Sequence, residues 1–259
     1  MKNKIYISIY LVLAALIILS ACHHSKNPPA PGQIGLHLHT MVDTNEVGAL
    51  GTFYPEPHST LWKAISLNYA QFYISGISLQ NPDGSWYPIP GAIVLKRYEI
   101  EDYYVASIPS GNYTSIRFYV GLDSATNATT PAQNNSAADS ILSGNENFMY
   151  FGAGQGYKFM AFSGATRTGT TDSIPFTYQI GGNQNRQLIT MPFLNYTVIP
   201  NQLLYVHIWC DYGRLLEGIT INNTTHNSGN SYGTGPQVTT ATLVADSIQN
   251  MFIYEPGQK

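Results

Sequence analysis

Apolar and polar residues alternate along much of the chain, a pattern typical of β-strands that bury one face. From Ile34 onward, apolar side chains recur at alternate positions, while His37 and His39 fall on the opposite face. A second alternating run extends from Tyr113 to Val120. Further strand-like runs lie at residues 67–79, 86–89, 93–95, 103–108, 157–162, 176–180, 188–193 and 203–210. Because turn-forming residues separate these short runs, the pattern predicts an all-β fold, an antiparallel β-sandwich of the immunoglobulin or transthyretin type.

The spacing of apolar residues becomes helical near the end of the chain. Thr239 or Thr240 can cap a helix there. One stripe of this helix is formed by Leu243, Val244, Ser247, Ile248, Met251 and Phe252. We expect this C-terminal helix to close one edge or end of the sandwich; docking on a partner is the alternative. Other helices are expected only as short insertions, and the Asn-rich residues 123–140 and 222–235 are predicted to be loops.

The first residues have the composition of a bacterial export signal. Lys2 and Lys4 precede an apolar run that ends at Ile18, and Leu19-Ser20-Ala21-Cys22 matches a lipobox. A transmembrane helix is the alternative, but the run is short for a hydrocarbon core of about 30 Å, and no basic cluster follows it. The sequence therefore predicts a lipoprotein signal peptide over residues 1–21 and an acylated Cys22.

Residues 22–33 are polar and rich in proline, which suits an extended tether between a lipid anchor and a folded domain over residues 34–259. Acyl chains on Cys22, palmitate among them, would hold the protein firmly on a lipid bilayer. His23 follows the cysteine where an aspartate would favour retention in the inner membrane. We therefore expect a cell-envelope protein on the outer membrane, on a face that the sequence does not specify.

Composition narrows the function further. Only 10% of the residues are charged, whereas 12% are aromatic, which is unlike disordered chains and helical bundles. The net charge is −3, and it falls to −5 when the signal peptide, with two lysines and no acid, is removed. This balance argues against nucleic acid as a partner.

Motifs for catalysis are lacking. The chain contains no G-x-S-x-G, no H-E-x-x-H and no phosphate-binding glycine loop. Residues 152–156 (GAGQG) do not open a helix within a βαβ unit, so they do not predict a dinucleotide site. Glu99, Glu101 and Asp102 lie near a turn and are expected to be solvated. We therefore expect a protein that is not an enzyme.

Two histidines one residue apart give the best candidate for chemistry. On a strand, His37 and His39 project from the same face roughly 6.6–6.8 Å apart, so both imidazoles can reach one metal ion. Met41 follows on that face, and His207, in another strand-like run, is a candidate third ligand. The alternative is that these histidines simply occupy the polar face of a half-buried strand.

The second cysteine, Cys210, has no intrachain partner once Cys22 is acylated. It lies in the strand-like run that contains His207. We expect a buried thiol that packs as a small apolar side chain, with metal ligation as the alternative.

Several segments, in order, resemble the MbnP-like family of secreted or membrane-anchored bacterial proteins associated with copper. Their sequences are GLHLH at 35–39, LNYAQFYISGISL at 67–79, IPSGNY through FYVGLD at 108–123, MYF with GYKF at 149–159, FTYQIGG at 176–182 and DSIQNMF at 246–252. The resemblance spans nearly all of the mature chain. It implies a β-sandwich and, in copper-binding members, a site made of histidines and an oxidisable tryptophan.

Two positions of this chain depart from that pattern. Phe151 stands where the family signature has tryptophan, and Gln179 stands where it has histidine. Glutamine is a poor ligand for Cu(I), and phenylalanine cannot be oxidised as an indole can. The resemblance therefore implies that the inherited copper site is lost, or is rebuilt around His37, His39 and His207.

Together these observations predict a lipid-anchored envelope protein that handles copper or another metal ion, or that binds an envelope partner protein. The alternative is a surface module that recognises glycans or proteins without a metal. The many tyrosines and asparagines motivate this alternative, since they offer flat aromatic faces and uncharged hydrogen bonds.

Overall fold

The computed structural model describes residues 28–134, 141–143, 148–222 and 224–257. The described residues from Pro31 onward form one compact unit. The expected signal peptide and Cys22 lie outside the described residues. Within the described ranges, no helix has the length and apolar character needed to cross a membrane.

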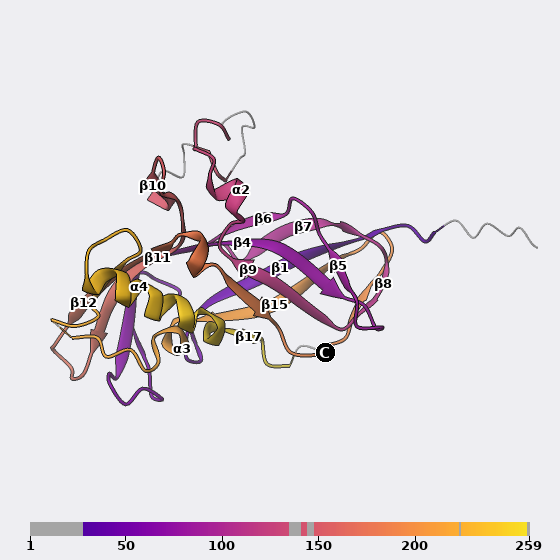
Figure 1. Cartoon of the computed structure of the whole chain (residues 1–259). Helices are drawn as coiled ribbons and strands as arrows, with labels where there is room; N and C mark the ends of the chain where they lie inside the picture. Colours follow the sequence, from indigo (N-terminus) through magenta and orange to yellow (C-terminus); the bar gives the residue numbers. More distant parts are fainter. Residues whose placement is uncertain (1–27, 135–140, 144–147, 223, 258–259) are drawn as a thin grey trace, which may run out of the picture. The chain divides into compact units, whose positions relative to one another are not determined.

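Sheet A holds the candidate site, and β1 (Gly32–Val42) is its central strand (Figure 1). Among the described residues it has five strands, the others being β15 (Leu203–Asp211), β7 (Asp102–Ile108), β2 (Asn45–Glu46) and β17 (Phe252–Tyr254). β15 pairs with one edge of β1, and β7 and β2 pair with successive parts of the other edge. β17 extends the sheet beyond β15.

Sheet B is larger and is built around the long strand β4 (Ala64–Gln80). Its main path runs β13 (Gln187–Thr190), β9 (Ser115–Val120), β4, β11 (Gly156–Arg167), β12 (Ile174–Gly181) and β16 (Ser228–Asn230). The short strands β3 (Phe53–Pro55), β5 (Trp86–Pro88) and β6 (Ile93–Arg97) also pair with β4, and β10 (Tyr150–Gly152) pairs with β11. A separate ladder joins β8 (Gly111–Tyr113) to β14 (Tyr196–Val198).

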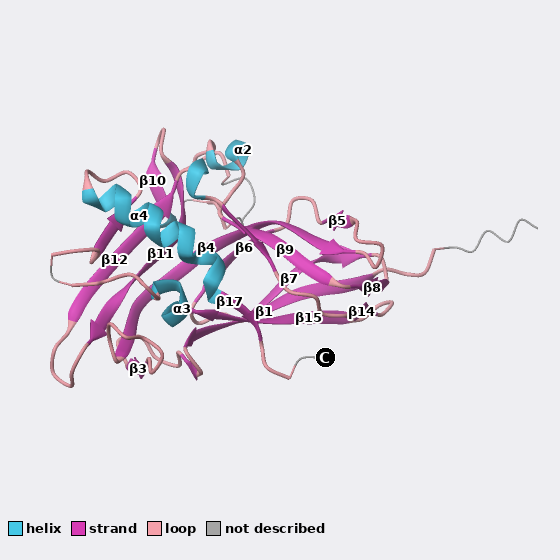
Figure 2. Ribbon diagram, turned by 60° about the horizontal axis from the view of Figure 1, so that its bottom comes forward, coloured by secondary structure: helices cyan, strands magenta, loops and turns pink. Residues whose placement is uncertain are grey.

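The helices are short, apart from α4 (Pro236–Ser247), which packs against β12 and β16 at one end of sheet B (Figure 2). In the part of the chain that the structure describes, the others are α2 (Ser124–Asn127), α3 (Tyr212–Leu216) and the 3₁₀ helices η2 (Asn183–Asn185) and η3 (Ile248–Met251). Val244, Ile248 and Met251 are fully buried, so α4 and η3 close the sandwich as expected. The helix begins earlier than predicted, however, because Pro236 fits the first helical turn, and Leu243 is exposed.

One apolar core joins the two sheets. Leu36 and Leu38 of β1 and Ile208 of β15 belong to the same buried cluster as Phe72 and Phe118 of sheet B. A second cluster, which includes Tyr73, Tyr157 and Phe159, is separate from this core. Strands β4 and β11 therefore bury side chains on both faces, which explains their long uninterrupted apolar runs.

The predicted all-β sandwich with a C-terminal helix is confirmed. Its sheets are mixed rather than wholly antiparallel, because β1 pairs in parallel with β15, and β12 with β16. Such pairings join segments far apart in the sequence, and strand patterns alone do not reveal them. The Asn-rich segments contain the helix α2 and the strand β16, besides residues 135–140 and 223, which lie outside the described residues. Residues 152–156 form the hairpin between β10 and β11, with positive φ at Gly152, Gly154 and Gly156.

Candidate metal centre

The three predicted histidines lie on the outer face of sheet A. His37 and His39 alternate along β1 with Leu36 and Leu38, which are fully buried in the core. His207 stands directly beside His37, because the parallel ladder pairs these two residues. In a parallel ladder, paired residues project to the same face of the sheet. All three imidazoles therefore point away from the core, with 19%, 14% and 37% of their side-chain surfaces exposed.

The rings lean together more closely than strand spacing alone requires. The centroid of His37 lies 4.4 Å from that of His39 and 4.5 Å from that of His207. One ring nitrogen from each histidine lies within 4.8 Å of those of the other two. The structure thus brings together the residues singled out in the sequence, in an arrangement that three ligands of one metal ion require.

Four carboxylates surround the histidines. Asp102 Oδ1 lies 2.6 Å from Nδ1 of His37, and Glu255 Oε2 lies 2.9 Å from Nδ1 of His207. Glu101 and Glu46 approach Nδ1 of His39 at 3.7 and 3.6 Å. A histidine that binds a metal commonly donates its other ring N–H to a carboxylate, which fixes the ring. His37 has this arrangement at Nδ1, so its Nε2 is the nitrogen available for a metal, whereas Nδ1 of His207 makes an ion-pair contact with Glu255.

Glu46 and Glu101 are also hydrogen bonded to each other. This bond raises the pKa of Glu101, which holds the proton, and lowers the pKa of Glu46, which accepts it. The pair therefore carries less negative charge than two separate carboxylates would.

One buried nitrogen tests whether these residues suit a metal. Nε2 of His39 is shielded from solvent and has no hydrogen-bond partner. The nearby carboxylate oxygen, Oε2 of Glu255, is 3.8 Å away, which is beyond hydrogen-bond distance. A buried polar atom without a partner costs free energy, and a metal bound at this nitrogen would remove that cost. Imidazole is a favoured ligand of copper, zinc and nickel, so the donor set fits such an ion.

The sequence did not predict that acidic residues belong to this site. Glu99 is exposed as expected, but Glu101 and Asp102 contact His37, so the expectation that all three are simply solvated was wrong. Asp102 reaches the site because β7 pairs with β1 and places it opposite His37. Glu46 and Glu255 arrive through β2 and the end of β17. No local motif marks these contacts, since each depends on strand pairing.

The turn before β7 is held by a buried lysine. Lys96 is 1% exposed, and its Nζ donates hydrogen bonds to the carbonyl oxygens of Arg97 and Ile100 at 2.6 and 2.7 Å. Burial lowers the pKa of this lysine. The next residue, Glu101, accepts a hydrogen bond from the Leu38 N–H through its own carbonyl oxygen. Lys96 therefore positions Glu101 without touching the histidines.

The other candidate ligands lie elsewhere. Met41 is buried at the end of β1 and does not belong to the three-histidine cluster. Cys210 is a free, fully buried thiol in the core, as predicted, and burial raises its pKa to about 12. Trp209, in contrast, pairs with His39 across the ladder and lies on the same face.

Phe151 and Gln179, the two altered family positions, lie in sheet B. The ring centroid of Phe151 is 4.9 Å from that of Tyr232, and Gln179 pairs with Ala161 of β11 and Asn230 of β16. His37 and His39 belong to sheet A, whose neighbouring strands are different ones. The histidine cluster is therefore built from a separate set of strands.

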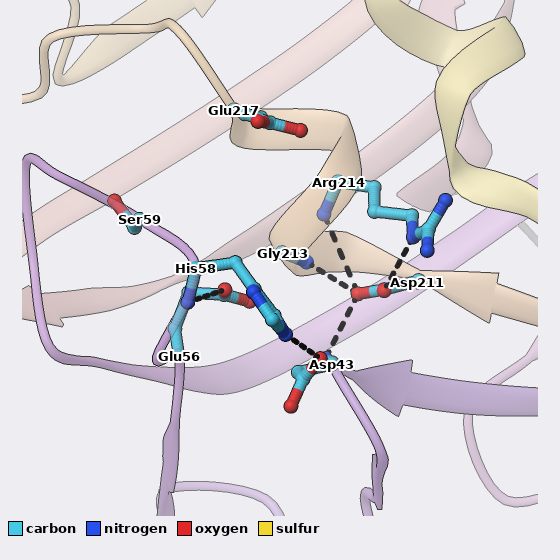
Figure 3. A pocket seen from close by; sticks show the side chains of 8 residues that line it. All are labelled: Asp43, Glu56, His58, Ser59, Asp211, Gly213, Arg214 and Glu217. Atoms are coloured by element: carbon cyan, nitrogen blue, oxygen red, sulfur yellow. Dashed lines mark hydrogen bonds and ion pairs between the residues drawn. The ribbon is translucent and has the colours of Figure 1, made fainter.

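A second polar site lies past the carboxyl ends of β1 and β15 (Figure 3). It is a cavity of about 290 Å³ lined by Asp43, Glu56, His58, Ser59, Asp211, Gly213, Arg214 and Glu217. Asp211 caps α3 by accepting N–H bonds from Gly213 and Arg214, and it also accepts one from Asp43. His58, in the loop after β3, pairs with Asp43 at 3.3 Å.

The acidic residues of this cavity stabilise the junction between the strands and α3. Burial is the main reason that the pKa values of Glu56 and Asp211 are both raised. The nearby carboxyls of Asp211 and Asp43 also raise the pKa of Glu56 through like charge. Because Asp211 is occupied by backbone donors, the cavity is a structural junction rather than a second histidine site.

The fold and the cluster define a β-sandwich protein with an imidazole and carboxylate site on one sheet face. Residues 31–232 match the family MbnP, and since this match covers most of the chain, the protein belongs to that family. Among solved structures, MbnP from Methylosinus trichosporium is similar, with a TM-score of 0.51 and 15% identity over 78% of this chain and 86% of that one. At this identity the likeness shows a shared fold. A search of curated proteins found no match.

Proposed function

We propose that this protein is a lipid-anchored envelope protein that binds a transition metal ion, copper foremost, through His37, His39 and His207. The observation that carries the proposal is the mutual approach of three ring nitrogens within 4.8 Å on one sheet face. In this proposal the protein is a binding protein rather than an enzyme, and its net charge of −3 does not suit nucleic acid as a partner.

The ion would be held by nitrogen ligands on a rigid base. His37 and His39 come from the central strand of sheet A, so neither depends on a loop for its position. Asp102 and Glu255 would keep Nδ1 of His37 and of His207 protonated and hold the rings in place. The half-buried rings leave a path for an ion from solvent.

Copper is favoured over other divalent ions for a chemical reason. Affinity of a nitrogen and oxygen site for first-row metals rises to Cu²⁺ and then falls at Zn²⁺. The resemblance to copper-associated proteins points in the same direction. The altered residues Phe151 and Gln179 do not weaken this proposal, because the histidine cluster uses neither.

Metal titration tests this function directly. His23 and His24 should first be replaced by alanine in every sample, so that adjacent histidines outside the domain bind no metal. Cu²⁺ and Cu⁺ are then titrated into this background and into the variant that also carries His37→Ala, His39→Ala and His207→Ala. We expect tight binding of the first equivalent, with nitrogen couplings in the electron paramagnetic resonance spectrum of Cu²⁺, and loss of both in the variant.

A matched control is available in His58→Ala, since His58 is 78% exposed and pairs with Asp43 outside the cluster. This control should bind copper as the background does. If the background binds no copper at about micromolar concentration, or if the triple variant binds it equally well, the proposal is wrong. Recognition of glycans or proteins would then become the better explanation of the polar, aromatic surface.

The lipid anchor is tested separately. We expect radiolabelled palmitate to be incorporated into the full chain in a bacterial host and not into a Cys22→Ala variant. Membrane fractionation of the same cells should place the labelled protein in the outer membrane. Equal labelling of the two proteins would refute acylation at Cys22.

A further inference from the structure

Two sets of metal-ligating side chains meet on the outer face of sheet A, and His39 belongs to both. The first is the set of three histidines. In the second, one ligand atom each from His39, Glu46 and Glu101 lies within 4.8 Å of the others. We propose that this face holds two cations, the second bound by His39, Glu46 and Glu101. This inference rests on the proposed function, because His39 ligates both ions.

The two ring nitrogens of His39 face different partners. Nδ1 lies 3.6 Å from Oε1 of Glu46 and 3.7 Å from Oε1 of Glu101. Nε2 lies 3.8 Å from Oε2 of Glu255, and this same oxygen is 2.9 Å from Nδ1 of His207. Nδ1 therefore points toward the carboxylates of Glu46 and Glu101, whereas Nε2 points toward His207. One imidazole in this position bridges two ions, and its remaining N–H proton leaves to solvent when the second nitrogen binds.

The carboxylates are placed by β-sheet pairing. Glu46 lies opposite Met41 in the ladder of β1 and β2, and the neighbouring Val47 N–H donates to the Thr40 carbonyl oxygen. Glu101 precedes β7 and accepts the Leu38 N–H. Both acids therefore flank β1 on the edge away from β15. Their side chains are 53% and 35% exposed, so an ion and its water ligands reach them from solvent.

The donor atoms indicate the class of ion. One imidazole and two carboxylates, with positions left for water, form a set that Zn²⁺ accepts. The three-histidine set is richer in nitrogen and suits copper better. The two nitrogens of the His39 ring can therefore bind two different divalent ions.

Charge on this face also suits two ions. Asp102 and Glu255 lie beside His37 and His207, and Glu46 and Glu101 lie beside His39. When the second ion binds, the proton shared by Glu46 and Glu101 leaves to solvent, and the four carboxylates then offset the charge of two divalent cations.

Sequential loading tests the proposal. The protein with His23→Ala and His24→Ala receives one equivalent of Cu²⁺, and Zn²⁺ is then added under equilibrium dialysis with metal analysis. We expect one copper and one zinc per chain. The double variant Glu46→Gln/Glu101→Gln should keep the copper and lose the zinc, whereas His39→Ala should lose the zinc and weaken copper. The control Glu99→Gln/Glu217→Gln, which changes two exposed acids, should bind as the starting protein does.

Three results separate the two proposals. Copper bound without zinc in the starting protein, or zinc retained in Glu46→Gln/Glu101→Gln, overturns the two-ion inference and leaves the three-histidine site intact. Absence of any bound metal overturns both. In a sample loaded with two Cu²⁺ ions, magnetic coupling through the shared imidazole should also reduce the paramagnetic signal per copper, and an undiminished signal contradicts a bridge at His39.

Discussion

His37 of β1 and His207 of β15 lie side by side on neighbouring parallel strands, with their ring centroids 4.5 Å apart. This pairing creates the cluster, because residues paired in a ladder project to the same face of the sheet. The strands on both flanks then supply the carboxylates that hold the rings. Each strand of sheet A that the structure describes therefore contributes to one site or to its support.

The hydrogen bond between Asp102 and His37 should matter more for metal affinity than for folding. Asp102 is 60% exposed, so Asp102→Asn should change the free energy of unfolding by less than about 0.5 kcal/mol. The amide no longer accepts the Nδ1 proton as a carboxylate does, and His37 is held less firmly. We expect copper affinity to fall by roughly 10- to 100-fold, measured by competition with a chelator of known affinity.

Asp246→Asn is the matched control for this experiment, since Asp246 is an exposed residue of α4. It removes one negative charge from the protein away from the histidines. An equal loss of affinity in both variants would mean that net charge, rather than the orientation of His37, determines copper binding.

Replacement of Lys96 should loosen the turn that carries Glu101. Lys96→Met keeps the length of the side chain but leaves the Arg97 and Ile100 carbonyl oxygens without their buried donor. We expect a loss of about 2 kcal/mol in the free energy of unfolding, measured by urea denaturation. Zinc binding at Glu101 should weaken, whereas copper binding at the histidines should persist.

Lys63→Met serves as the control, because Lys63 is exposed and the variant should be within about 0.5 kcal/mol of the unchanged protein. If Lys96→Met proves as stable as this control, the two hydrogen bonds of Lys96 do not hold the turn.

Much of the fold could be predicted because its signals are local. Alternation identified β1 and β9, where Ile116, Phe118 and Val120 are indeed fully buried. Cys210 was predicted to be a core residue from the apolar run around it. The helix α4 was found from its stripe of apolar residues, but its beginning was placed too late because the threonines suggested a cap inside the helix.

The candidate site was predicted only in part. The spacing of His37 and His39 fixes their common face, since strand geometry alone determines it. The acids could not be found in this way. Glu101 and Glu255 reach the histidines through pairing between strands far apart in the sequence, and Glu46 through the very short strand β2 that follows β1. Residues near a turn look solvated until the register of the neighbouring strand is known.

The acidic cavity near α3 should make stability depend on pH. Burial raises the pKa of Glu56, so the folded state holds this proton more tightly than the unfolded state. Protonation of Glu56 therefore stabilises the folded state at pH values below the unfolded pKa. This stabilisation is lost as the pH rises through the folded pKa. Glu56→Gln should therefore stabilise the protein by about 1 kcal/mol at neutral pH. The gain should disappear near about pH 4, where both side chains are neutral.

Urea denaturation at several pH values measures this difference, with Glu217→Gln, an exposed residue of the same cavity, as the control. A gain that is the same at all pH values would show that the carboxylate charge of Glu56 is not its cause.

The fluorescence of Trp209 should change when a metal ion binds. Trp209 is one of three tryptophans and pairs with His39 across the β1 and β15 ladder, where neighbouring strands are about 4.8 Å apart. A paramagnetic Cu²⁺ ion at His39 should quench its fluorescence strongly, whereas Trp62 is buried in the core and Trp86 packs under Arg117 in sheet B. We expect one equivalent of Cu²⁺ to remove most of the Trp209 emission, and Trp209→Phe to abolish most of the quenching without changing the copper stoichiometry. Trp86→Phe, the control, should leave the quenching intact. Equal quenching in Trp209→Phe and the unchanged protein would place the bound copper away from His39.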